Sequence, residues 1–542
     1  MMELAACCFC SERHARTLLR QLSDAGWLQW RAQAGRAKRG ELRFLLSPEE
    51  ARATVVGKEL DKGLHQNALE LAQLAPDQLR QLLYPHLGGQ WQNDVPTLRI
   101  PYYRPLEPIT PGFLEGRAEK HFTGQVYAGL TRFTQDCPLP KPDLAHHWHV
   151  SDDGLSWDFF LHPTLYWHNG ERVKTSQLHQ QLTALLALPA IGRLFNSIAA
   201  IEMPHGGCLR FVLHRPDYWL AHRLASYCSR LAHPNHPQIG SGPFRITRFK
   251  DNLVRLESFE YYHLRHPLLA AVEYWITPQL FDTLSDTSCL HPVQIAIGQP
   301  EQLTYLRPVT RQISLGFCYL AIKQEGRLNK RQARALMQMV HRPDIIATLP
   351  VNNTLLTATT EILPGWEIAR WPTEEGLTLP EKLTLIYHLP VELHAIARQL
   401  KYHLAEYGCD LTLIFHNAKT WSDCPLLEQA DIVMGDRLIG ESAGYTLEQW
   451  LRCDPLWPGL LSPSSYRHLC EQLDQVQLVA DGEARLRAMK HLYYGLTDEA
   501  IMTPLFNYRY QISAPPGVEG IAINEWGWFD FSQAWLPPPG MS

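Results

Sequence analysis

The apolar pattern of the first 46 residues predicts a short helix followed by a β-hairpin. Ser11 is a suitable N-cap, because its hydroxyl can satisfy a free amide of the first helical turn. Gly26 ends the helix, and the segments WLQW and ELRF alternate as strands do. One face of the helix carries four apolar residues: Ala15, Leu18, Leu19 and Leu22. This order predicts the second half of a winged helix-turn-helix, with MELAACCF as its supporting helix.

The pattern changes twice along the rest of the chain. Residues 47–96 have helical spacing and predict a helical connector, which the stretch GGQWQNDVP interrupts near its end. From Thr97 onward, short strands alternate with helices. The stretch KLTLIYHLPVELHAIARQLKYHLAEYGCDLTLIFHN predicts strand, helix and strand, and ADIVMG supplies a further buried strand. The apolar face of that helix consists of Leu393, Ile396, Ala397, Leu400 and Leu404. Such units stack into a parallel or mixed sheet flanked by helices, which is an α/β fold.

Charge divides the chain into a basic start and an acidic remainder. Residues 1–46 hold eight Lys/Arg against four Asp/Glu, about +4, while the whole chain has a net charge of −5 and the rest therefore carries about −9. A polyanionic partner would meet the basic part. The sequence has no apolar run long enough for a membrane span, and its N-terminus lacks the order of a secretory signal. We therefore expect a cytoplasmic protein with no membrane partner.

The basic side chains of the first 46 residues predict contacts with double-stranded DNA. The helix would enter the major groove, and the loop of the hairpin would hold the phosphate backbone. The predicted DNA-binding residues are Arg13, His14, Arg16, Thr17 and Arg20 on the helix, and Arg31, Arg36, Lys38 and Arg39 in the hairpin. The alternative is a solvated basic face on a small α+β cap. A winged helix normally has one more helix beneath this pair, so either translation starts upstream of the assigned position or the head is truncated.

Several stretches resemble those of known proteins. LAHHWHVSDDGLSWDFFLHPTLYWHNGERV, IGSGPF and RQARALMQMVHRPDII resemble, in order and spacing, the landmarks of oligopeptide/dipeptide-type (family 5) solute-binding proteins. Together with the basic head, LRIPYYRP and WGWFDFSQAW, the chain is similar over nearly its whole length to the SgrR-type transcriptional regulators. The resemblance implies a cytoplasmic DNA-binding regulator whose sensor is a solute-binding domain, in a family associated with sugar-phosphate stress.

The resemblance also implies a fold and its division. The fold is a two-lobe, periplasmic-binding-protein-like (class II) α/β domain preceded by the small winged helix-turn-helix. We expect the winged helix at 1–46, the connector at 47–96, lobe I at 97–275 and 510–542, and lobe II at 276–509. A ligand that contacts both lobes would close them. The alternative function is a solute-binding protein of an ABC-type importer.

The resemblance places candidate ligand-binding residues between the lobes. Peptide-binding relatives hold the peptide amino group with an aspartate after the strand that ADIVMG matches. The usual Asp-Tyr-Pro-Asp run is absent here, and Asp436 or Glu441 would substitute. Tyr103 and Arg104 follow the first strand of lobe I, and Arg104 would pair with a phosphate or form a structural salt bridge. Trp526 would stack on a sugar or pack in the core. The ligand would be a sugar phosphate, a sugar or a short peptide.

Three other motifs predict no further chemistry. GESAG fits the G-x-S-x-G elbow of serine hydrolases with Ser442 at its centre, but ADIVMG ends several residues before it. The histidines of HHWH lie within the strand signature of the fold. Cys7 and Cys10 form one C-x-x-C without a second pair, which favours small buried residues over zinc ligands. We expect no enzymatic activity, metal or cofactor.

Overall fold

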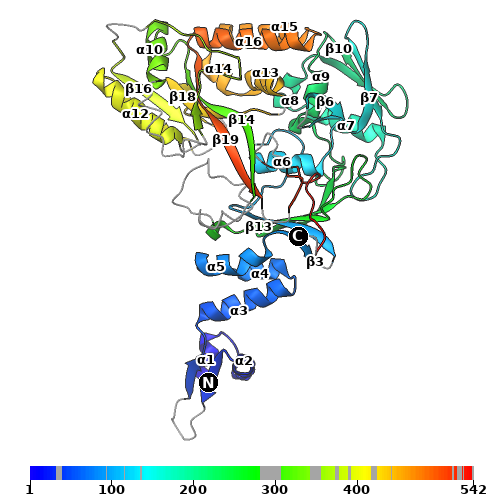
Figure 1. Cartoon of the computed structure of the whole chain (residues 1–542), viewed down its shortest axis with the longest axis vertical. Helices are drawn as coiled ribbons and strands as arrows, with labels where there is room; N and C mark the ends of the chain where they lie inside the picture. Colours follow the sequence, from blue (N-terminus) through cyan, green and yellow to red (C-terminus); the bar gives the residue numbers. More distant parts are fainter. Residues whose placement is uncertain are drawn as a thin grey trace.

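The computed structural model has a small N-terminal head, a helical connector and a large body of two lobes (Figure 1). The N-terminus lies in the head, and the C-terminus lies beside the part of the body that adjoins the connector. The structure describes residues 1–31, 40–92, 94–114, 116–134, 137–280, 307–341, 356–372, 378–388, 392–416, 421, 424–440, 442–514, 518–521, 528 and 530–539.

The head contains the predicted helix and hairpin. Its elements are α1 (Met2–Cys7), α2 (Glu12–Asp24), β1 (Leu28–Arg31) and β2 (Glu41–Phe44). The Ser11 hydroxyl accepts a hydrogen bond from the His14 amide at 3.2 Å, which confirms the predicted N-cap. The strands pair antiparallel, and Ala15 and Leu19 are buried. The prediction for the cysteines was wrong in its burial, because Cys7 is exposed and Cys10 is partly exposed at the end of this small head.

The connector consists of three helices: α3 (Pro48–Asp61), α4 (His65–Leu71) and α5 (Pro76–Leu83). A capping box starts α3, in which the Ser47 hydroxyl accepts from the Glu50 amide and the Glu50 carboxylate accepts from the Ser47 amide. The apolar faces of the three helices share one core with Trp275 and Leu253 of lobe I. This shared core joins the connector to lobe I.

Lobe I is built around two sheets. The five-stranded sheet has the order β11-β12-β13-β4-β3, in which β13 and β4 run parallel and the other neighbours antiparallel. The four-stranded antiparallel sheet has the order β7-β8-β10-β9. The bounds of these strands are β3 (Gly88–Gln92), β4 (Val95–Tyr102), β7 (Ala145–Val150), β8 (Ser156–Leu161), β9 (Ile198–Glu202), β10 (Cys208–Leu213), β11 (Phe244–Phe249), β12 (Leu253–Ser258) and β13 (Ala271–Ile276).

Four helices and a small hairpin complete lobe I. They are α6 (Arg117–Val126), α7 (Thr175–Leu186), α8 (Pro189–Leu194), α9 (Leu220–Ala225), and the pair β5 (Thr131–Thr134) and β6 (Cys137–Pro142). Helix α6 and the C-terminal residues Trp528 and Phe531 share the core of the five-stranded sheet. The described C-terminal segment therefore belongs to the same core as β4, near the start of the body.

Lobe II contains one six-stranded sheet with the order β15-β19-β14-β18-β16-β17. Its strands are β14 (Arg307–Ile322), β15 (Leu356–Ala358), β16 (Lys382–Tyr387), β17 (Asp410–Phe415), β18 (Ile432–Leu438) and β19 (Met502–Ala514). Its helices are α10 (Lys330–Val340), α12 (Glu392–Glu406), α13 (Ala443–Cys453), α14 (Leu456–Leu460), α15 (Pro463–Gln477) and α16 (Gly482–Asp498). Alternate strand residues enter two cores, one with α10 and α12 and the other with α13–α16.

The long strands β14 and β19 run from the sheet of lobe II toward the five-stranded sheet of lobe I (Figure 1). They pair antiparallel along most of their length, with several irregularities in register. Strand β19 runs through position 510, where we expected the chain to change lobe, and the domain boundaries remain predictions.

Candidate functional site

A cavity of about 450 Å³ lies between the two lobes. From lobe I, it is lined by side chains that include Lys120, Gln125, Arg132, Tyr227 and Arg230. From lobe II, it is lined by side chains that include His388, Asp436, Arg437, Tyr445 and Trp450. Clefts that bind small molecules in proteins have volumes of about 300–1,000 Å³. The cavity is therefore large enough for a small solute, and both lobes contribute to its walls.

The lobe II wall carries two carboxylates and one guanidinium. Asp436 is near the end of β18, and its carboxylate lies 4.0 Å from the His388 ring. Burial raises the pKa of Asp454, whose carboxylate accepts a hydrogen bond from the Leu456 amide at 3.0 Å. The Arg437 guanidinium lies 5.8 Å from the centre of the Trp450 ring. This wall can accept hydrogen bonds from a cationic or hydroxylated group.

The lobe I wall combines the cations Lys120, Arg132 and Arg230 with two carboxylates, Asp143 and Asp530. Lys120 lies 5.3 Å from the centre of the Tyr227 ring, and Arg132 donates to a backbone carbonyl at 3.3 Å. Burial alone would raise the pKa of Asp143, but the hydrogen bond from His263 and the charge of Arg230 lower it overall. Since Asp143 already has two basic partners, this wall presents positive charge to the cavity.

Several buried polar atoms in the cavity lining have no hydrogen-bond partner among the described residues. Two of them are the Tyr445 hydroxyl and the Gln125 side-chain oxygen, on residues that are 1% and 6% exposed. A buried polar group without a partner is costly, so such groups commonly bond water or a ligand. Together they offer a solute one donor from lobe II and one acceptor from lobe I.

The predicted ligand-binding residues differ in their position relative to the cavity. Asp436 lines the cavity. Tyr103 and Arg104 are outside its lining, and Arg104 donates two hydrogen bonds to the buried Glu119 at 2.7 and 2.8 Å. Although burial disfavours its charge, this contact raises the pKa of Arg104. The structure thus shows the salt-bridge alternative for Arg104, and a ligand role for it stays a prediction. Glu441 and Trp526 lie outside the described residues.

Sequence reasoning missed most of the cavity lining. Tyr445 is in the first turn of α13, and Lys120 and Gln125 are on α6. Nothing in the spacing of these residues indicates that α6 and α13 face each other. The one available signal was the position of AGYTLEQW shortly after the strand that carries Asp436.

The head exposes its basic residues to solvent. On α2, the described side chains of Arg13, His14, Arg16, Thr17 and Arg20 are all exposed, opposite the buried Ala15 and Leu19. Arg16 lies 3.5 Å from Glu12 in an exposed ion pair, which screens its charge only weakly. Arg31 is exposed at the end of β1. Arg36, Lys38 and Arg39 lie outside the described residues. The helix therefore has the exposed basic face that was predicted.

The hydrolase motif does not form a catalytic arrangement among the described residues. Ser442 is buried at the start of α13 with a φ of −106°, rather than the strained backbone of a nucleophile elbow. His468 is largely exposed and its ring lies 3.8 Å from Glu471. In the same part of the chain, no group of three or more His, Cys, Asp or Glu side chains is placed to hold a metal ion. None of the described helices is long and apolar enough to cross a membrane.

Comparisons with known proteins match both the N-terminal part of the chain and the body. Residues 1–94 match the family "Sugar transport-related sRNA regulator N-term", and residues 140–285 match "Bacterial extracellular solute-binding proteins, family 5 Middle". The chain is 59% identical to YbaE of Escherichia coli (strain K12) over 537 residues, 99% of this chain and 95% of YbaE. It is 29% identical to the HTH-type transcriptional regulator SgrR of Yersinia pestis (strain Pestoides F), over 99% of this chain and 95% of that protein.

A solved structure confirms the fold of the body. NikA from Brucella suis, in complex with Fe(III)-EDTA, superposes with a TM-score of 0.65 at 15% identity and covers 82% of this chain and 100% of its own. This likeness confirms the predicted two-lobe fold. The match of the head and connector, the match of the body and the full-length relatives agree with the resemblance seen in the sequence. The chain therefore belongs to the SgrR-type family, in which an sRNA-regulator N-terminal domain precedes a family 5 solute-binding domain.

Proposed function

We propose that the protein is a cytoplasmic transcriptional regulator that binds double-stranded DNA through its head and senses a small solute in the cavity between its lobes. The observation that carries the proposal is the exposed basic face of α2, joined through the connector to a two-lobe solute-binding body. The SgrR relatives, which are HTH-type transcriptional regulators, support the DNA-binding part. Because its relatives are regulators and solute-binding proteins, we also propose that the chain is not an enzyme.

The cavity supports a small polar ligand. Its lobe I wall offers Lys120 and Arg132 to an anionic group, while its lobe II wall offers Asp436 to a cation or a hydroxyl. A sugar phosphate would use the cations and the hydroxyl-binding groups, and a short peptide would place its amino group at Asp436. A sugar phosphate would also connect the protein to sugar-phosphate stress. Native mass spectrometry of freshly purified protein would weigh whatever the cavity retains and separate these classes by mass.

The DNA-binding proposal predicts that Arg13→Ala/Arg16→Ala weakens DNA binding by the full-length protein. Both residues project from the exposed face of α2, where each would neutralise a phosphate. Each lost phosphate contact should lower the slope of log affinity against log salt by about 1. The measurement is fluorescence anisotropy of labelled promoter duplexes between low and physiological ionic strength.

A control with the same change in net charge is Lys401→Ala/Arg487→Ala. These two exposed cations are on α12 and α16 of lobe II, far along the chain from the head. This variant should bind DNA as the unmodified protein does. Equal affinity of all three proteins, or no binding even at low salt, would refute the proposal.

A further inference from the structure

We propose that Arg223 holds the two lobes together as the centre of a buried ion-pair network, so that the cavity is closed even without a ligand. The inference rests on the proposed function only in treating the cavity as the ligand site. Arg223 would then be a positioning residue, which acts on the ligand through the walls that it joins.

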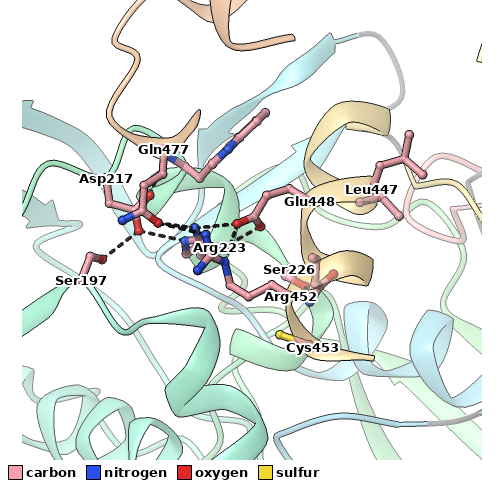
Figure 2. Close-up of polar contacts among 12 residues, drawn as sticks. Ser197, Asp217, Arg223, Ser226, Leu447, Glu448, Arg452, Cys453 and Gln477 are labelled. Carbon is pink, nitrogen blue, oxygen red and sulfur yellow. Dashed lines mark hydrogen bonds and ion pairs between the residues drawn. The ribbon is translucent and has the colours of Figure 1, made fainter. Parts of the chain in front are cut away.

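The network crosses from lobe I to lobe II at Arg223 (Figure 2). The Arg223 Nε donates to Asp217 at 2.9 Å within lobe I. Its two terminal nitrogens donate to the Glu448 carboxylate of α13, in lobe II, at 3.0 and 3.1 Å. One of them also donates to Gln477 at the end of α15, at 3.2 Å. All three nitrogens of the Arg223 guanidinium therefore donate hydrogen bonds. Of the four bonds, three go to lobe II.

A second crossing lies beside the first. Arg452 of α13 donates to Glu448 at 2.6 Å and to Asp474 of α15 at 2.8 Å. Asp474 in turn lies 2.8 Å from Arg215 of lobe I. We call Arg215, Asp217, Arg223, Glu448, Arg452, Asp474 and Gln477 the inter-lobe network. It contains three cations and three carboxylates, so its charges balance.

Because the centre of the inter-lobe network is buried, a partial opening of the two lobes is unfavourable. The side chains of Asp217, Arg223 and Glu448 are all 0% exposed. A buried pair that loses one partner leaves an uncompensated charge in a medium of low polarity, which is strongly unfavourable. The lobes should therefore be either closed with the network intact or open with every member hydrated. Neighbouring contacts favour closure, since the Tyr218 amide donates to the Gln477 carbonyl at 2.9 Å and Arg485 of α16 lies 4.4 Å from the centre of the Trp219 ring.

The same elements form the network and the cavity walls. On α13, Tyr445, Gln449 and Cys453 line the cavity, while Glu448 and Arg452 face the network. These are two faces of one helix, because residues four apart lie on the same side. In lobe I, Ser226 and Tyr227 directly follow α9, which carries Arg223, and both line the cavity. Ligand and network therefore stabilise the same arrangement of α9 and α13.

The test is small-angle X-ray scattering of the full-length protein, dialysed to remove small solutes. The unmodified protein should fit the closed arrangement of lobes. Arg223→Met keeps a side chain of similar length but removes the charge, so its radius of gyration should increase. Arg215→Met removes only the partly exposed crossing to Asp474 and should produce a smaller increase. Circular dichroism would establish that each variant is folded.

Arg210→Met provides the matched control. Arg210 pairs with Asp158 at 2.6 and 2.9 Å, but both belong to neighbouring strands of lobe I. Its loss should leave the radius of gyration unchanged. If Arg223→Met does not fold, the Arg215→Met result decides. An unmodified protein that scatters as an open molecule, or folded Arg223→Met and Arg215→Met variants with unchanged radii, would overturn the proposal. These outcomes do not depend on DNA binding, so the proposed function can fail separately.

Discussion

At the scale of single residues, the charged groups that matter most in the structure are buried and paired. Arg104, for which a phosphate partner or a structural salt bridge was expected, pairs with Glu119, and Asp436 lines the cavity. The sequence shows the type of each residue but not its partner. An arginine after a strand has the same local sequence signal whether it faces a cavity or a carboxylate.

Glu273 of β13 helps to hold the connector against lobe I. Its carboxylate lies 3.2 Å from the His65 ring of α4 and also accepts from Arg99, Arg255 and the Trp275 indole. Burial opposes its ionisation, but His65 and Arg99 outweigh that effect and lower the pKa of Glu273 to about 2, from 4.5. Its contribution to stability is therefore complete above about pH 4.5 and is lost as the pH falls toward 2.

We predict that Glu273→Gln lowers the free energy of unfolding at pH 7 by about 3–5 kcal/mol, because it leaves buried cations without their carboxylate. The difference between variant and unmodified protein should shrink below pH 4.5, where the Glu273 carboxyl of the unfolded chain begins to protonate while that of the folded protein stays ionised until about pH 2. Urea unfolding at several pH values measures both effects. A difference that stays constant down to pH 3 would contradict this account of the site. Glu257→Gln, in a more exposed pair with Arg255, is the control and should cost much less.

At the scale of elements, the structure contains the helix and hairpin predicted for the head and the strand, helix and strands predicted around α12. The five residues assigned to the apolar face of α12 are all buried, and β16, β17 and β18 run parallel within a mixed sheet, one of the two sheet types expected. These predictions succeed because side-chain periodicity follows directly from the geometry of a helix or strand. The connector was predicted as helical, but its division into α3 and α4 at Gly63, which has a φ of +73°, was not.

Helix α2 should depend on its N-cap. We predict that Ser11→Ala weakens the helix by about 1 kcal/mol, because the His14 amide loses its acceptor. Hydrogen exchange of the α2 amides should become faster by roughly fivefold, and DNA binding should weaken with it. Ser11→Asp keeps an acceptor at the cap and should retain slow exchange. Equal exchange in the alanine and aspartate variants would show that the cap does not stabilise this helix.

At the scale of the whole molecule, the arrangement limits how a ligand can influence the head. The connector, to which the head is attached, shares a core with Trp275 and Leu253 of lobe I, so connector and lobe I should move together. Closure should therefore change the position of lobe II relative to all three. In the alternative, which we do not expect, the connector would change its angle to lobe I when the lobes close.

We predict that Arg223→Met also changes the affinity of the full-length protein for promoter duplexes. Coupling between distant sites is typically 1–3 kcal/mol, which corresponds to a change of roughly five- to 150-fold. Arg210→Met should leave the affinity unchanged, since it does not touch the lobe interface. Anisotropy titrations of both variants measure the effect. If Arg223→Met opens the lobes in solution and the affinity stays constant, the head does not respond to closure.

The sequence by itself determined the local elements and the basic head, because these depend on the spacing of residue types along the chain, which is visible without knowing what they contact. The family and the two-lobe fold were expected from the resemblance of whole stretches to known proteins. Only the tertiary structure decided which distant residues meet. Arg223 and Glu448 are separated by 225 positions and Arg99 and Glu273 by 174, and neither pair shows any periodicity that joins its members. The reason is physical: local geometry follows from a residue and its neighbours, whereas the pairing of buried charges follows from how complete lobes pack.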